Sequence, residues 1–161
     1  MSTLVVYYSL SCGNTERVAE MVADALDADI EAIETVEPYP GDYQEVVDQG
    51  KREVERGYKP AIEALEFGPE GYDRIVVGTP TWWYTMAPAV ATYLSEYDWR
   101  GKTVVPFQTH GGWPGETLDD IVDACDGARI EHGISVQFDS TGGDRMITPL
   151  SDVERWIDSL K

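Results

Sequence analysis

The sequence predicts an α/β fold: a three-layer sandwich in which a five-stranded parallel sheet of order 2-1-3-4-5 carries helices on both faces. Two observations lead to this prediction. Short apolar runs alternate along the chain with longer segments in which apolar residues recur at helical spacing. Some of these runs are almost wholly apolar, as strands buried on both faces are, and others alternate between apolar and polar residues. Strands that alternate with helices form parallel sheets with right-handed crossovers.

The strands are expected in five segments. The nearly continuous apolar runs at residues 4–8, 75–78 and 103–107 form the centre of the sheet. The alternating runs at residues 30–34 and 134–138 form its two edges. With the second and fifth strands at the edges, 2-1-3-4-5 is the natural order. Ligands in such a sheet bind at the carboxyl ends of strands one and three, where the winding direction reverses.

Helices fill the gaps between the strands. Pro88 falls near the start of one of them, where its missing N–H costs nothing. A charged segment at residues 42–56 is expected to form a further, weakly amphipathic helix. The residues expected on the buried helical faces are Val18, Val22, Ala25 and Leu26; Met86, Ala89, Val90, Tyr93, Leu94 and Tyr97; Leu118, Ile121, Val122 and Cys125; and Leu150, Val153, Ile157 and Leu160.

Length and composition predict one cytoplasmic domain that spans residues 1–161. No run of 18 apolar residues and no signal-peptide pattern occurs. The cysteines, Cys12 and Cys125, make neither a disulfide framework nor a metal site. The histidines, His110 and His132, lie far apart in the sequence without ligand spacing, so no metal is expected.

The charge is unusual, because 30 acidic residues against 12 basic ones give a net charge of −18. Nucleic-acid binding needs basic patches, and anionic membranes attract basic segments, so both classes of partner are excluded. Two explanations remain: docking to basic partners, or adaptation to molar salt, where self-repulsion is screened. We favour the second because lysine is scarce and acids are spread along the chain, and the two explanations are compatible.

The first strand is followed by S-L-S-C-G-N-T-E at residues 9–16. A loop that leads into a helix offers unpaired N–H groups and the positive end of the helix dipole, which suit a phosphate. Gly13 allows close backbone approach, and Asn14 can cap the helix. The loop has no lysine, so neutral donors would hold the anion, and a capped turn without function is the alternative. The hydroxyl donors are Ser9, Ser11 and Thr15.

Other phosphate chemistries do not match this loop. It lacks the Gly-Lys-Ser/Thr of a Walker loop and the G-x-G-x-x-G of a dinucleotide fingerprint. A cysteine phosphatase would use Cys12, but Arg17 follows one position too early for such loops. A phospho-receiver needs an aspartate at the end of the first strand, where this chain has Tyr-Tyr-Ser.

Two further loops follow central strands. Residues 79–86 read T-P-T-W-W-Y-T-M, and three consecutive aromatics cannot all point into the core. Exposed aromatics at this edge suggest a stacking platform for a flat conjugated ring, with a structural plug as the alternative. Residues 108–115 read Q-T-H-G-G-W-P-G, a glycine-rich loop whose N–H groups can reach a ligand edge. His110 by itself is more typical of a loop residue than of a catalyst.

A phosphate at one end, a flat ring at the other and a polar linker between them describe flavin mononucleotide (FMN). The chain resembles the flavodoxin family from its first strand to its last helix. The matching motifs are S-x-S…G-N-T-E at residues 9–16, T-P-T-W-W at 79–83 and V-V-P-F-x-T-H-G-G at 104–112. The fifth strand has no long insertion, so the chain resembles the short-chain type.

The resemblance implies a one-electron carrier with tightly but non-covalently bound FMN and no catalytic residue. By the same resemblance, the phosphate is bound by Ser9, Leu10, Ser11, Cys12, Gly13, Asn14 and Thr15. The isoalloxazine ring is bound by Pro80, Thr81, Trp82, Trp83 and Tyr84. The ring edge and the ribityl chain are bound by Thr109, His110, Gly111 and Gly112. The chain departs from the family at Cys12, an extra residue in the phosphate loop, and at Tyr84, where similar proteins often have glycine.

Two alternative functions remain at this stage. The same fold hosts FMN-dependent NAD(P)H oxidoreductases that act on quinones or similar acceptors, and it also hosts flavin-free structural relatives. The expected partners are redox proteins of unknown identity, with no nucleic acid and no membrane. We expect a monomer or a weak homodimer.

Overall fold

The structure is a computed structural model that describes residues 2–10 and 13–161. Ser11 and Cys12, which the sequence analysis assigns to the phosphate loop, lie outside the described residues. Within the described ranges, no helix is both long and apolar enough to cross a membrane.

The described residues form thirteen elements in chain order. They are β1 (Thr3–Tyr7), α1 (Asn14–Leu26), β2 (Asp29–Ala32), α2 (Tyr43–Arg56), the 3-10 helix η1 (Pro69–Gly71), β3 (Arg74–Trp82), β4 (Thr85–Met86), α3 (Pro88–Ser95), β5 (Thr103–His110), α4 (Thr117–Ala124), β6 (Arg129–Ile130), β7 (Ile134–Gln137) and α5 (Leu150–Ser159).

The sheet has the predicted parallel core. Its order is β2-β1-β3-β5, and both β6 and β7 pair with the outer side of β5. The predicted fifth strand at residues 134–138 is β7, so the predicted order 2-1-3-4-5 is confirmed. The sequence analysis missed β6 and β4, the second of which pairs antiparallel with the end of β3. Both have two residues, which is too short to show a period.

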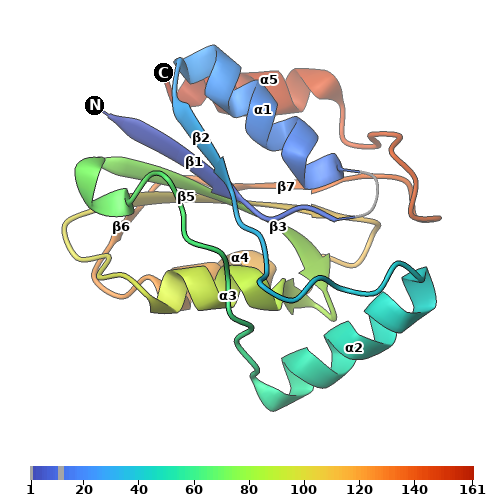
Figure 1. The fold of residues 1–161 in the computed structure, drawn as a ribbon. Coiled ribbons are helices and arrows are strands. Elements are labelled where there is room, and N and C mark those ends of the chain that lie inside the picture. Colours follow the sequence, from blue (N-terminus) through green and yellow to red (C-terminus); the bar gives the residue numbers. More distant parts are fainter. Residues whose placement is uncertain (1, 11–12) are drawn as a thin grey trace.

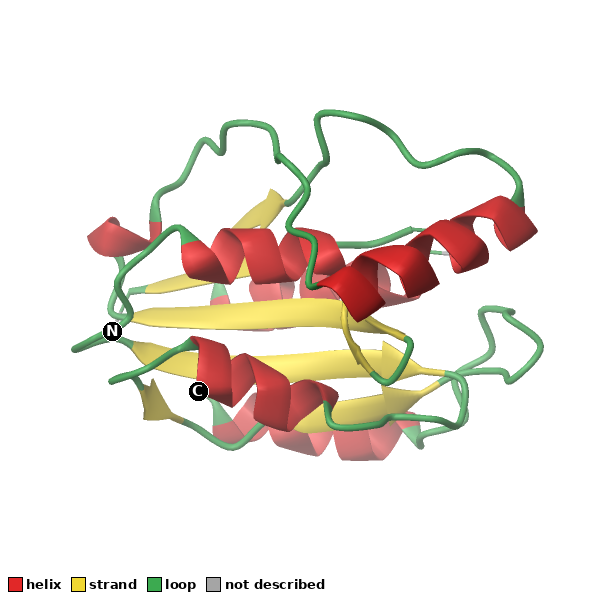
Figure 2. Ribbon diagram, turned by 90° about the horizontal axis from the view of Figure 1, so that it is seen from below, coloured by secondary structure: helices red, strands yellow, loops and turns green. Residues whose placement is uncertain are grey.

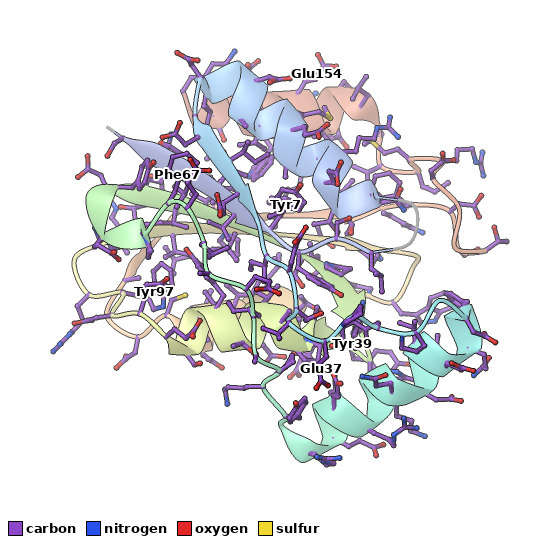
Figure 3. The ribbon with its side chains drawn as sticks, in the orientation of Figure 1. Tyr7, Glu37, Tyr39, Phe67, Tyr97 and Glu154 are labelled. Carbon is purple, nitrogen blue, oxygen red and sulfur yellow. The ribbon has the colours of Figure 1, made fainter. Side chains whose placement is uncertain are left out.

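Helices cover both faces of this sheet (Figure 1, and from below in Figure 2), with α1 and α5 on one face and α3 and α4 on the other. Alternate residues of β1 divide between the two cores. Leu4 and Val6 belong to the core under α3 and α4, and Val5 and Tyr7 to the core under α1 and α5. Figure 3 labels Tyr7 beneath α1. The predicted three-layer sandwich is therefore confirmed.

The predicted helix at residues 42–56 is α2, and its ends have clear causes. The side chain of Asp42 accepts a hydrogen bond of 2.8 Å from the backbone N–H of Gln44, which caps the helix. Gly57 ends it with a left-handed φ of 62°. The helix lies to one side of the sheet (Figure 1) and buries only Gly50 and Glu53. It is the least embedded of the long helices.

The predicted buried faces are mostly confirmed. Cys125 is 2% exposed, and burial raises the pKa of its thiol to about 12, as expected of a core residue. The prediction for Ala25 is wrong. The buried face of α1 includes Val18, Ala19, Val22 and Ala23, and Ala25 lies on the exposed side of the helix. The predicted burial of Leu150 is also wrong, because this residue is the first of α5 and is 50% exposed.

Candidate functional site

Two adjoining clefts lie beyond the carboxyl ends of β1, β3 and β5, the edge where the sequence predicted a ligand. The larger has a volume of about 610 Å³ and the smaller about 200 Å³. Of the predicted residues, the larger is lined by Leu10, Asn14, Thr15, Pro80, Thr81, Trp82, Thr109, His110 and Gly111. The smaller is lined by Thr81, Trp83, Tyr84, His110, Gly111 and the unassigned Trp113. Ser9, Gly13 and Gly112 line neither.

The first turn of α1 forms one end of the larger cleft. Gly13 precedes the helix with a φ of 73°, a left-handed conformation that glycine adopts without strain. The expectation that Asn14 caps the helix is wrong, because Asn14 is its first helical residue. Its side-chain Nδ2 instead donates a hydrogen bond of 3.1 Å to the carbonyl of Gly143. The side-chain oxygen of Asn14 is buried beside the cleft without a partner among the described residues.

Hydroxyl groups tie this turn to its neighbours. Thr15 is 2% exposed, and its hydroxyl oxygen lies 2.8 Å from that of Thr109 at the end of β5. Ser9 accepts a hydrogen bond of 3.3 Å from the backbone N–H of Glu16. The first turn therefore keeps its position relative to two of the three central strands.

A tight hairpin forms the opposite end. β3 and β4 are joined by two residues, Trp83 and Tyr84, whose φ values are 50° and 70°. Positive φ at both positions is typical of a type I′ turn, which usually contains asparagine and glycine. A side chain in this region costs about 1–2 kcal/mol per residue. The strained turn leaves Trp83 38% and Tyr84 58% exposed beside the smaller cleft.

Contacts from two elements hold the hairpin. The indole N–H of Trp83 donates a hydrogen bond of 3.0 Å to the carbonyl of Val47 in α2. The ammonium of Lys51 lies 5.3 Å from the centre of the Trp83 ring. On the other side, the carbonyl of Tyr84 accepts a hydrogen bond of 3.0 Å from the N–H of Glu116. The peptide after Tyr84 is therefore already engaged by the protein.

Trp82 differs from the two aromatics that follow it. Its ring packs edge-on against Tyr8 and Tyr39, with centroid separations of 5.9 and 5.0 Å. A side chain at Gly50 would come within 3.1 Å of the indole, so the glycine lets α2 approach. Trp82 is half-buried against the core, while Trp83 and Tyr84 are exposed, so the expectation that the three aromatics cannot all point into the core is confirmed.

The loop after β5 is folded by a contact from its own histidine. The N–H of Gly112 donates a hydrogen bond of 2.9 Å to Nδ1 of His110. Gly112 has a φ of 122°, a conformation that favours glycine. Burial lowers the pKa of His110, so the imidazole stays neutral at neutral pH.

The sequence analysis missed the loop after β7. Phe138, Asp139, Ser140, Thr141, Gly142 and Gly143 also line the larger cleft, as does Tyr43 from the start of α2. Asp139 accepts hydrogen bonds from the hydroxyl and the N–H of Thr141, at 2.6 and 2.9 Å, which lower the pKa of its carboxyl. The run S-T-G-G after a parallel strand has the composition of the predicted loops and could have revealed this wall.

The two clefts suit a ligand with one anionic and one aromatic end. Helical N–H groups and hydroxyls gather at one end, and exposed aromatic rings at the other. Among the described residues that line them, neither lysine nor arginine occurs, and Asp139 alone carries a formal charge at neutral pH. An anionic group would therefore be held by neutral donors.

Known proteins resemble this chain in sequence and in fold. A family model described as flavodoxin matches residues 2–145. A protein of Bacteroides uniformis assigned as a flavoprotein is 25% identical, with a TM-score of 0.79; the match covers 98% of this chain and 97% of that one.

Two other solved structures share the fold. A Lactobacillus acidophilus flavoprotein in complex with FMN is 24% identical, with a TM-score of 0.70; the match covers 83% of this chain and 92% of that one. A short-chain flavodoxin associated with a bacterial microcompartment is 20% identical, with a TM-score of 0.56; the match covers 98% of this chain and 93% of that one. A comparison with curated protein sequences finds no match.

Proposed function

Because the chain belongs to the flavodoxin family, we propose that it binds FMN without a covalent bond and carries single electrons between redox proteins. One observation carries this proposal. The larger cleft begins at the donors of α1, and the smaller one is bordered by exposed aromatic rings. The two clefts share the lining residues Thr81, His110, Gly111 and Trp113. FMN has the same sequence of parts: a phosphate, a polar ribityl chain and a flat ring.

The residues at the phosphate end fit FMN. The N–H groups in the first turn of α1, other than those of Glu16 and Arg17 that already donate to Ser9 and Gly13, would donate to a dianion together with the hydroxyl of Thr15. The buried oxygen of Asn14 accepts hydrogen bonds only, so its partner would be a ribityl hydroxyl and not a phosphate oxygen. The carboxylate of Asp139 would be a further hydrogen-bond acceptor for the hydroxyls of the ribityl chain. These residues would hold FMN at its phosphate and its ribityl hydroxyls.

The residues at the ring end also fit. Trp83 and Tyr84 on one loop and Trp113 on another present 38%, 58% and 61% of their surface. Their apolar rings would cover a flavin ring and exclude water from it. When bound, FMN would supply the redox chemistry, and the protein would supply binding, orientation and electrostatics.

The electron-carrier role is supported by family membership and by the acidic surface. A net charge of −18 would attract redox partners that carry basic patches and would repel an anionic dinucleotide. We propose such redox proteins as the partners.

A reductive titration followed by visible absorbance tests this role. We expect two separated one-electron steps and no rapid reduction when NADH or NADPH is added alone. Reduction in a single two-electron step, together with bleaching by either nucleotide, would instead identify the alternative, an FMN-dependent NAD(P)H oxidoreductase.

A further inference from the structure

His110 lies at the junction of the two clefts. Thr81, Gly111 and Trp113 also border both. The hydroxyl of Thr81 already donates a hydrogen bond of 3.1 Å to the carbonyl of Thr109, and Gly111 has no side chain. The imidazole of His110 makes one hydrogen bond among the described residues, through Nδ1, which leaves Nε2 for a ligand.

The contact with Gly112 determines where the imidazole carries its hydrogen. An N–H group can donate only to a nitrogen with a free lone pair, so Nδ1 is unprotonated. A neutral imidazole has one N–H, which must then be on Nε2. Protonation of Nδ1 would set two hydrogens against each other across 2.9 Å and break the turn. The loop thus presents a neutral histidine with one defined donor.

We propose that His110 donates a hydrogen bond from Nε2 to the N1 and C2-carbonyl edge of the FMN ring, and that this bond favours the reduced ring. The inference rests on the proposed function. The ribityl chain is attached at N10, close to N1. A residue at the junction of the larger cleft, which would hold the ribityl chain, and the smaller cleft, which would hold the ring, therefore borders this edge. The atoms there are hydrogen-bond acceptors.

The Nε2 donor of His110 binds the reduced ring more strongly than the oxidised ring because the reduced ring carries a charge. At neutral pH the fully reduced ring tends to be an anion, with its charge on the N1 side. A hydrogen bond to a charged acceptor is roughly twice as strong as one to a neutral acceptor. His110 therefore offsets part of the repulsion that a molecule of net charge −18 exerts on the reduced ring. Through this direct hydrogen bond, His110 raises the reduction potential of the bound ring.

Two isosteric substitutions separate this role from a structural one. In His110→Asn, the side-chain oxygen takes the place of Nδ1 and can accept the N–H of Gly112, but the donor at Nε2 is lost. In His110→Gln, the side-chain amide nitrogen takes the place of Nε2 and keeps the donor, but the acceptor for Gly112 is lost. Each variant therefore keeps one of the two hydrogen bonds.

The measurement is the midpoint potential of the second electron step in wild type and both variants, each loaded with FMN. We expect His110→Asn to bind fully reduced FMN about tenfold less tightly relative to one-electron-reduced FMN, which lowers the potential of this one-electron step by about 59 mV. His110→Gln should stay close to wild type. A shift in His110→Gln without one in His110→Asn, or no shift in either, would overturn the proposal.

A second measurement reads the histidine without the cofactor. Nitrogen NMR of the FMN-free protein at neutral pH should show a protonated Nε2 and an unprotonated Nδ1 in His110. A charged ring or the opposite tautomer would overturn the proposal whether or not FMN binds. Failure of the wild type to bind FMN would instead refute the proposed function, and this inference with it.

Discussion

The hydroxyl of Tyr39 donates a hydrogen bond of 2.6 Å to one carboxylate oxygen of Glu53, a residue that is 7% exposed. Gln49 donates to the other oxygen at 2.9 Å. Figure 3 labels Tyr39 in the segment beside α2, and its ring packs on Trp82 at the cleft. A buried acid on α2 is thus bonded to the aromatic side chain that supports the candidate site.

This contact predicts opposite outcomes for two substitutions of the same kind. Tyr39→Phe removes a hydrogen bond to a charged group, so the free energy of unfolding should fall by about 1.5–3 kcal/mol. Tyr93 is the matched control, because its hydroxyl is buried without a partner among the described residues. Tyr93→Phe removes an unsatisfied polar group and should leave stability unchanged or raise it. Urea denaturation measures both, and equal losses would contradict the assigned contacts.

Alkaline pH should destabilise the protein through the same tyrosine. Burial, and then the hydrogen bond to Glu53, raise the pKa of Tyr39 in the folded state. The contribution to stability is therefore complete below the unfolded pKa of about 10 and is lost as pH rises above it. The difference in unfolding free energy between wild type and Tyr39→Phe should shrink from pH 9 to pH 11. A constant difference across this range would show that Tyr39 is not linked to the titration.

The strained hairpin predicts a stabilising substitution. Tyr84 has a φ of 70° and is 58% exposed, so glycine would relieve backbone strain while little burial is lost. Tyr84→Gly should raise the unfolding free energy by about 1 kcal/mol relative to Tyr84→Ala, which loses the ring but keeps the strained Cβ. Equal stability of the two variants would show that the turn carries no strain. FMN affinity should fall similarly in both, because both lose the aromatic ring.

Stability should rise with salt. Among the described residues there are four ion pairs, so most of the 30 acidic side chains have no basic partner. Their mutual repulsion destabilises the compact state, and molar salt screens it to a few ångströms, about 3 Å at 1 M. The melting temperature should increase substantially from dilute buffer to molar potassium chloride. A flat profile would favour docking to basic partners as the reason for the acidity.

The sequence predicted the parts of the fold that depend on periodicity. The runs that became β1, β3 and β5 lie between two helical layers, so they are apolar throughout and easy to identify. The same patterns placed the first three loops at one edge. Periodicity did not show β4 or β6, and it did not show that Trp82 packs inward against Tyr39, because that contact depends on the position of α2 and on the missing side chain of Gly50.

The site was predicted less completely for a related reason. Asn14 was expected to cap α1, but it bonds instead to the carbonyl of Gly143, a residue distant in the sequence. The loop at residues 138–143 approaches α1 only through tertiary contacts such as this one. Local composition indicated what kinds of residue the ligand would meet, whereas the wall beside α1 at residues 138–143 depended on how the last strand lies beside β5.

The most direct test of the central claim is a binding titration of the cofactor-free protein with FMN, riboflavin and FAD, followed by flavin fluorescence. We predict one FMN per protein chain, with the flavin fluorescence strongly quenched by the aromatic residues that line the smaller cleft. Riboflavin should bind much more weakly, because it lacks the phosphate that the first turn of α1 would hold. FAD should not bind in place of FMN. Equal affinity for FMN and riboflavin, preference for FAD, or no binding of any flavin would contradict the proposed function.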